Sequence, residues 1–455
     1  MTITNEHRYS SWRNVLLLVA LLGIAADVLA DDPVDRVKAL EQKLERSLRL
    51  IEQLTHRIGE LEKKVPPGSA ATATITEPSP PPERPSTSIA TLQEEIDQIN
   101  QGLSLRGFDF GLPIHGFADV QAAASSAADP LRLKGFNGGT LDLYLTPQFG
   151  NRIRSLIEIA VEYEPGTRST AIDMERLQLG YTVSDELTLW MGRFHTPFGV
   201  WNTSFHHGAN LQTSIYRPRF IEFEDRGGII PAHSVGLWGN GKADVGAGKL
   251  TYDVYISNGP SIRDRELDFH PFTDADDRKM FGVNFGFQPS GVLRGLSAGL
   301  HGFTSRVAVH SASDAVVNRS HLQMAGAYSA YDAKDWEIFA EYYRFFNRDD
   351  LSDVRHKSHA GFIHAGRTFG TLTPYLRYER VSLDPTDIYF NSQRTGRSYT
   401  RQVVGSRYAL DARSSVKFEL SRTDEAALNQ YDGTGIVLTP RSKYQRAAFQ
   451  YSIAF

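Results

Sequence analysis

Charged and titratable side chains gather in one stretch of this sequence, residues 194–231. Those that could act on a passing solute are His195, His206, His207, Arg217, Arg219, Glu222, Glu224, Asp225 and Arg226. Three arginines and three acids occur together here, and histidines titrate near neutral pH. Both signs of charge across a narrow water path create a transverse field, which orients polar solutes. The stretch therefore predicts the constriction of a channel, if the rest of the chain builds a channel around it.

A second group of charged residues occurs in segments whose polarity alternates from one position to the next. These residues would line the wall of a wet lumen: Arg154, Glu158, Arg377, Arg401, Arg407, Lys417 and Arg446. Arginines predominate toward the C-terminal end, but neighbouring glutamates balance them. Strong anion selectivity needs rings of one sign, so the wall does not predict it. Charges that only keep the lumen wet and pair with one another explain the same pattern.

The residue types give little support to disulfides, metal binding or nucleophilic catalysis. The absence of Cys excludes disulfides, thiolate metal sites, a Cys nucleophile, covalently attached c-type haem and an acylated lipid anchor. His206 and His207 are adjacent, so they would point to opposite faces of a strand, and no acid lies at ligand spacing. Ser204 precedes His206 by two residues, but nothing marks it as a nucleophile. We predict no enzyme activity, no cofactor and no bound metal.

The elements that must position these residues follow an export signal. Arg8 and Arg13 precede an apolar run over residues 15–26, which is shorter than the roughly 20 residues of a membrane-spanning helix. Val28 and Ala30 provide the short side chains that a signal peptidase reads. We expect a signal peptide over residues 1–30, with an uncleaved anchor as the alternative.

The next segments suggest a helical stalk on a tether. Apolar residues repeat every seven positions from Val37 to Val65, which predicts an α-helical coiled coil over residues 31–65, either dimeric or trimeric. Residues 66–88 contain seven Pro and form a semi-rigid linker. A shorter heptad stretch over residues 89–105 predicts either a second oligomerising helix or an amphipathic helix that caps the next domain.

From residue 106 to residue 455 the polarity alternates with a period of two. Segments of about ten residues with this alternation predict the strands of a transmembrane β-barrel. We expect sixteen of them: 114–124, 139–148, 152–163, 173–183, 186–193, 232–240, 249–258, 279–288, 295–304, 321–331, 335–345, 358–368, 372–381, 400–411, 414–422 and 444–455. The predicted fold class is all-β, a 16-stranded antiparallel barrel preceded by the coiled coil.

The links between the predicted strands alternate between short and generally longer ones. Short periplasmic turns, long outer loops and an even number of strands are typical of bacterial outer-membrane barrels. The longest link, residues 194–231, is the third outer loop, which in porins folds into the barrel. The last segment carries aromatic residues on one face and ends in Phe455, like the signal that the barrel-assembly machinery reads.

Composition alone would suggest an ordinary soluble protein. The mean hydropathy is −0.33 and the net charge is −4. A barrel that is polar inside and apolar outside has a similar average, so these values do not exclude it. A nucleic-acid binder would be more basic, and we predict no nucleic-acid partner.

The stretch Gly192-Arg193-Phe194-His195-Thr196-Pro197-Phe198-Gly199 follows an early predicted strand. Together with a signal peptide, coiled coil, Pro-rich spacer and barrel, it resembles the phosphate-selective (polyphosphate-selective) porin-like family. The resemblance covers most of the chain in architecture but only this short stretch in motif. It implies a homotrimeric porin in the outer membrane of a Gram-negative bacterium, with the coiled coil in the periplasm.

These patterns predict a water-filled channel, because a 16-stranded barrel is wide enough to leave one. We expect passive diffusion of small polar or anionic solutes, with phosphate suggested by the resemblance alone. The expected partners are two further copies of the chain, outer-membrane lipid and lipopolysaccharide, and the barrel-assembly machinery through Phe455. The alternative is a structural tether, or a sleeve around a larger export or electron-transfer complex.

Overall fold

The computed structural model describes residues 114–126, 134–149, 151–164, 169–205, 210–274, 278–333, 335–432 and 434–455. The predicted signal peptide, coiled coil, linker and second heptad helix, residues 1–105, lie outside these ranges. So do His206 and His207. These assignments remain predictions from the sequence.

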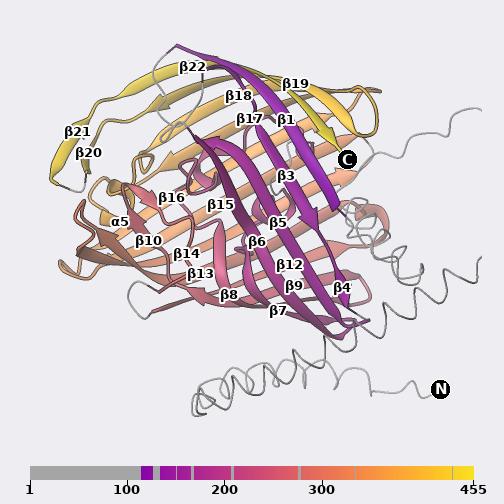
Figure 1. The fold of residues 1–455 in the computed structure, drawn as a ribbon, viewed down its shortest axis with the longest axis horizontal. Helices are drawn as coiled ribbons and strands as arrows, with labels where there is room; N and C mark the ends of the chain where they lie inside the picture. Colours follow the sequence, from indigo (N-terminus) through magenta and orange to yellow (C-terminus); the bar gives the residue numbers. More distant parts are fainter. Residues whose placement is uncertain are drawn as a thin grey trace, which may run out of the picture. The chain divides into compact units, whose positions relative to one another are not determined.

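The described chain forms a closed antiparallel β-barrel of sixteen strands (Figure 1). Its strands are β1 (Ile114–Ser125), β3 (Thr140–Leu145), β5 (Ile153–Glu164), β6 (Ser169–Ser184), β7 (Leu187–His195), β8 (His233–Asp244), β9 (Gly248–Asn258), β12 (Lys279–Pro289), β13 (Leu296–His310), β14 (Val316–Ala333), β15 (Trp336–Asp349), β16 (Arg355–Arg367), β17 (Leu372–Ser382), β18 (Tyr399–Ala409), β19 (Ser414–Glu425) and β22 (Ser442–Ala454). The barrel closes where β1 pairs with β22, from Phe117 opposite Ala454 to Ser125 opposite Arg446.

Shorter elements lie in the links between these strands. They are the strands β2 (Gly135–Asn137), β4 (Gln148–Phe149), β10 (Ser261–Arg263), β11 (Glu266–Leu267), β20 (Leu428–Tyr431) and β21 (Ile436–Thr439), the 3₁₀ turns η1 (Arg219–Ile221) and η2 (Gly291–Leu293), and the helices α4 (Trp201–Ser204) and α5 (Ile388–Asn391). Within the described ranges, no helix is long and apolar enough to cross a membrane.

Each of the sixteen predicted strands coincides with a barrel strand, and the largest differences lie at the outer ends of β13 and β14. The sequence predicts a long link over residues 305–320, whereas β13 runs on to His310 and β14 begins at Val316. At the end of β13, Val307, Ala308 and Val309 are all buried and β10 pairs beside them, while Val316 and Val317 at the start of β14 are both exposed, so the alternation fades there. The hydrogen-bonded ladder continues without it, which is why the sequence pattern underestimates the strand length.

Alternation along the strands separates two environments. On β19, Phe418 and Leu420 are exposed on the outside, while Lys417 and Glu419 are buried inside. On β22, Phe449 is exposed and its neighbour Ala448 is buried. Lipid has no hydrogen-bonding groups, so apolar side chains face it and the polar ones turn inward. The interior of the barrel is therefore where charged residues and the functional site must be sought.

Candidate functional site

The segment between β7 and β8, residues 196–232, folds into the barrel, and we call it the inner loop. Its Trp201 backbone N–H donates to Glu341 Oε1 on β15 at 2.6 Å. Further along, the Arg219 N–H donates to Glu379 Oε2 on β17 at 2.9 Å. These acceptors lie on strands far from β7 and β8 in the barrel order, so the inner loop crosses the lumen.

The Gly-Arg-Phe-His-Thr-Pro-Phe-Gly stretch makes this inward turn. Gly192 has φ +130° and Gly199 has φ +61°, and residues with side chains rarely adopt either conformation. A Cβ atom at Gly199 would lie 2.0 Å from Glu341 Oε2. Pro197 cannot donate to a strand ladder, so β7 ends before it. The two glycines and the proline thus have a local structural role. They end β7 and allow the inner loop to pack against the opposite wall of the barrel.

Aromatic side chains fix the inner loop to the wall formed by β13 to β16. Trp201 lies edge-on to Phe339 and Phe362, with ring centroids 5.8 Å and 5.4 Å away. Phe220 meets Tyr343 in the same way at 5.2 Å. All five side chains are buried, and pairs of this geometry contribute about 0.5–1.5 kcal/mol each beyond the area they bury. This side of the lumen is filled by side chains.

Charged wall residues bind the backbone of the inner loop. Glu419 Oε2 accepts from the Ile215 N–H at 3.1 Å. Lys417 Nζ donates to the Gln212 carbonyl at 2.6 Å and to the Ser214 carbonyl at 3.2 Å. Backbone groups taken out of water need such partners, because leaving them unpaired costs free energy. The charged wall residues therefore make the backbone hydrogen bonds that a neighbouring strand or helical turn would make in a regular segment.

The predicted wall residues have partners inside the barrel. These are Thr182 for Arg154, Arg176 for Glu158, Glu379 for Arg377, Glu419 for Arg401, Asn210 for Arg407, the inner-loop carbonyls for Lys417 and the Tyr216 ring for Arg446. An anion-guiding ladder would need arginines open to the water path. Here Arg377 and Arg401 pair with glutamates, and Arg407 and Arg446 contact Asn210 and Tyr216 of the inner loop, so these arginines are engaged inside the barrel.

Two predicted constriction residues, Arg217 and Arg219, hold the inner loop in different ways. Arg217 donates to the Phe205 carbonyl at 2.8 Å and to the Ile221 carbonyl at 3.0 Å. Burial lowers the pKa of Arg217, while the nearby Glu222 charge acts in the opposite direction. Arg219 instead reaches across to the wall and pairs with Glu425.

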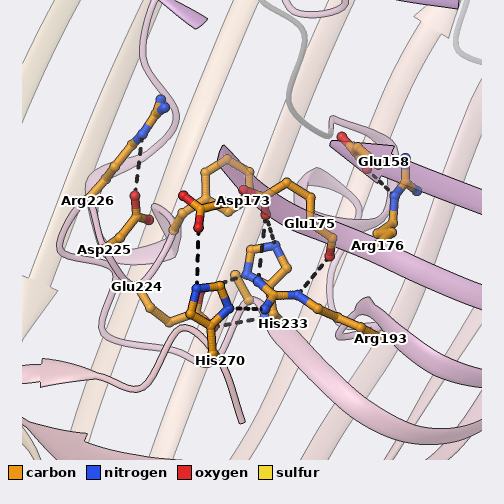
Figure 2. A network of polar contacts seen from close by, with 12 residues as sticks. Glu158, Asp173, Glu175, Arg176, Arg193, Glu224, Asp225, Arg226, His233 and His270 are labelled. Atoms are coloured by element: carbon orange, nitrogen blue, oxygen red, sulfur yellow. Dashed lines mark hydrogen bonds and ion pairs between the residues drawn. The ribbon is translucent and has the colours of Figure 1, made fainter. Parts of the chain in front are cut away.

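A polar network joins the exit of the inner loop to β6, β7 and an outer loop (Figure 2). His233 Nδ1 lies 2.9 Å from Glu224 Oε2, and its Nε2 lies 3.1 Å from Glu175 Oε2. Arg193 donates to His270 Nδ1 at 2.6 Å. Burial, together with the Arg193 charge, lowers the pKa of His270, so this imidazole is neutral near pH 7 and can accept the bond. His195 lies against the network, with its ring edge-on to that of His233.

Sequence analysis identified Glu224 and His195 in this network but missed Glu175, His233 and His270. The missed residues come from β6, β8 and an outer loop, and no spacing along the chain relates them. The alternation along β6 was the available signal, because it places two acids, Asp173 and Glu175, two positions apart on the same strand. Their partners emerge only when the barrel is assembled.

Asp225 and Arg226 are the predicted constriction charges that retain substantial exposure. Their side chains are 32% and 30% exposed. Arg226 pairs with Glu162 on β5 and donates to Thr140 Oγ1 on β3 at 3.2 Å. This end of the inner loop therefore faces the wall formed by β1 to β6, opposite the aromatic side.

The wall that faces Asp225 and Arg226 is polar and rich in acids. Its inward carboxylates are Asp119 on β1, Asp142 on β3 and Glu158 and Glu162 on β5. Arg176 on β6 pairs with Glu158 and lies 5.6 Å from the Tyr144 ring. Among the candidate residues that the structure describes, the partly exposed pair Asp225 and Arg226 therefore lies between this wall and the rest of the inner loop.

No protein-family model matches the chain, and a comparison with curated protein sequences finds no match. The structure is similar to that of the anion-selective porin from Comamonas acidovorans, with a TM-score of 0.52 and 12% identity over 75% of this chain and 98% of that one. This is a porin fold. The trimer form of OmpT from Vibrio cholerae has a TM-score of 0.49 at 11% identity, over 75% of this chain and 98% of that one. The channel DcaP of Acinetobacter baumannii has 0.47 at 11%, over 75% and 96%.

Proposed function

We propose that the protein is a porin of a Gram-negative outer membrane, with a water-filled channel through which small polar solutes diffuse passively. The observation that carries this proposal is the inner loop, which fills one side of a closed 16-stranded barrel and presents Asp225 and Arg226 to a polar wall on the other. A loop that narrows a wide barrel without being a separate domain suits size-limited diffusion. A homotrimer, as the resemblance implies, is part of the proposal.

We place the solute path between this wall and the inner loop, and the charges beside the path set the solute class. Asp119 and Asp142 add negative charge to the wall, whereas Glu158 and Glu162 pair with Arg176 and Arg226. The arginines of the opposite wall are engaged by the inner loop and by glutamates. This arrangement favours neutral polar solutes and cations over anions. Transport of anions such as phosphate is supported only by the short sequence resemblance.

A liposome-swelling assay tests the solute class. Purified protein in lipid vesicles should admit small neutral sugars, with a rate that falls steeply as the sugar grows, and it should admit phosphate no faster than a neutral solute of similar size. Vesicles without protein are the control. Swelling no faster than in the control would contradict the channel, and a strong preference for phosphate would contradict the solute class.

The packed inner loop also favours a channel over a sleeve. A sleeve must leave its lumen free for another chain, whereas in this barrel Trp201 packs on Phe339 and Phe220 packs on Tyr343, and all four rings belong to one buried cluster. Opening the lumen would break that cluster and expose it to water, at a cost of about 1.5–3 kcal/mol for each large apolar side chain.

A further inference from the structure

Three ionisable residues meet at the outer end of the barrel, away from the inner-loop site. Asp349 ends β15, His356 lies near the start of β16 and Asp387 precedes α5. One ligand atom from each lies within 4.8 Å of the others. All three side chains are buried, with His356 only 2% exposed and Asp349 only 7% exposed. Residues from three separate segments thus converge on one small volume.

A fourth residue fixes the direction of the imidazole. Asp384 Oδ2 lies 3.1 Å from His356 Nδ1, and Asp384 is itself held by the Thr386 N–H and hydroxyl. The other ring nitrogen, Nε2, consequently points toward Asp349 and lies 3.4 Å from its Oδ2. A carboxylate behind one nitrogen of a histidine, with the other nitrogen directed at a cluster of ligands, is the usual arrangement around a metal-binding histidine.

Atoms inside the cluster lack hydrogen-bond partners. His356 Nε2 and Asp349 Oδ1 are both buried, and neither has such a partner among the described residues. A buried polar atom without a partner costs free energy, and buried carboxylates cost more when they lie together. A cation bound to the imidazole Nε2 and to the Asp349 carboxylate would reduce both penalties, because each group would donate an electron pair to it.

We propose that Asp349, His356 and Asp387 bind a divalent transition-metal ion, for which Zn²⁺ is the best fit. Zn²⁺ combines imidazole with carboxylate ligands at about 2.1 Å, so two tetrahedral ligands lie about 3.4 Å apart. The distance between His356 Nε2 and Asp349 Oδ2 already has this value. Ca²⁺ and Mg²⁺ prefer oxygen ligands alone. Three protein ligands leave a fourth position for water, and Asp384 orients the histidine without touching the ion.

The bound ion would stabilise an outer loop that presses on the inner loop. Asp387 accepts a hydrogen bond from the Tyr389 N–H, and the Tyr389 hydroxyl donates to the Ile229 carbonyl of the inner loop at 2.8 Å. Thr395 donates to the Gly227 carbonyl at 2.7 Å. The ion therefore ties β15 and β16 to the loop that covers residues 227–229.

Zinc binding by the purified barrel tests the proposal. After treatment with a chelator, the wild-type protein should bind one Zn²⁺ per chain in a calorimetric titration. His356→Gln and Asp349→Asn should each weaken binding at least about tenfold. His359→Gln is the matched control, because His359 lies on the same strand outside the cluster and packs on Tyr342. Wild-type protein without a stoichiometric site, or a His356→Gln variant that binds like the control, would overturn the proposal.

Cobalt provides a measurement that does not depend on the folding of variants. Co²⁺ added to the wild-type barrel should give the intense visible absorption of a four- or five-coordinate site, and Zn²⁺ should abolish it. Asp384→Asn should shift this spectrum, since it frees the imidazole to rotate, and Asp384→Glu should restore it. A spectrum that stays that of hexaaqua cobalt would contradict the site.

Discussion

At Gly199, both the backbone conformation and the packing require a residue without a side chain. Its φ of +61° suits glycine, and a Cβ atom there would collide with the Glu341 carboxylate. That carboxylate holds the Val200 and Trp201 N–H groups at the start of the inner loop. The Gly-Arg-Phe-His-Thr-Pro-Phe-Gly stretch is thus explained by the turn it makes, whatever solute the channel admits.

Gly199→Ala should destabilise the barrel by about 1–3 kcal/mol, because it strains the backbone and displaces the acceptor of two buried N–H groups. Guanidinium unfolding in lipid measures the loss. Gly246→Ala is the control, since Gly246 also has a positive φ, +78°, but a Cβ atom there would meet no atom within 4 Å. Equal losses for the two variants would mean that the contact with Glu341 contributes nothing.

Lys417 provides a second test at this scale. Its ammonium group donates to two inner-loop carbonyls, so Lys417→Met leaves them buried without a donor. We expect a loss of about 1–3 kcal/mol in unfolding free energy, together with a noisier open-channel current as residues 212–214 loosen. Lys249→Met, at an exposed position of β9, is the control and should change neither. A quiet, fully stable Lys417→Met channel would contradict the bracing role.

At the scale of elements, strands and inner loop differ in how far the sequence predicts them. Strands such as β19 are predictable because lipid and water impose opposite polarities on successive residues, Phe418 and Glu419 for example. The rank and length of the third outer loop point to a segment that enters the barrel. Its packing is not predictable, because partners such as Glu341 and Glu379 lie more than a hundred residues away along the chain.

The same limit applies to the candidate sites. Sequence alone identifies Arg217 and Arg377 as inward charges, but not that their donors bind carbonyl groups of the inner loop. It also gives no sign of the Asp349, His356 and Asp387 cluster, for which we propose a metal although the sequence predicts none. Those residues belong to three segments, and only the pairing of β15 with β16 brings the first two together.

At the scale of the whole molecule, the average composition results from different environments. Apolar residues such as Leu376 and Val404 face outward. Charged residues face inward and pair with one another or with the inner loop, as Arg377 does with Glu379. A mean hydropathy of −0.33 and a net charge of −4 are therefore compatible with a membrane barrel. Both values are averages over residues in two environments, the outer surface and the interior of the barrel.

In our proposal, solutes pass between the inner loop and the acidic wall of β1 to β6. Single-channel recording in planar bilayers under a salt gradient tests this path. The wild-type oligomer should insert in conducting steps, and its reversal potential should indicate a weak preference for cations. Asp225→Lys should shift the reversal potential toward the value expected of an anion-selective channel, because this partly exposed carboxylate borders the path. Bilayers that stay silent, or a reversal potential that Asp225→Lys leaves unchanged, would contradict the account.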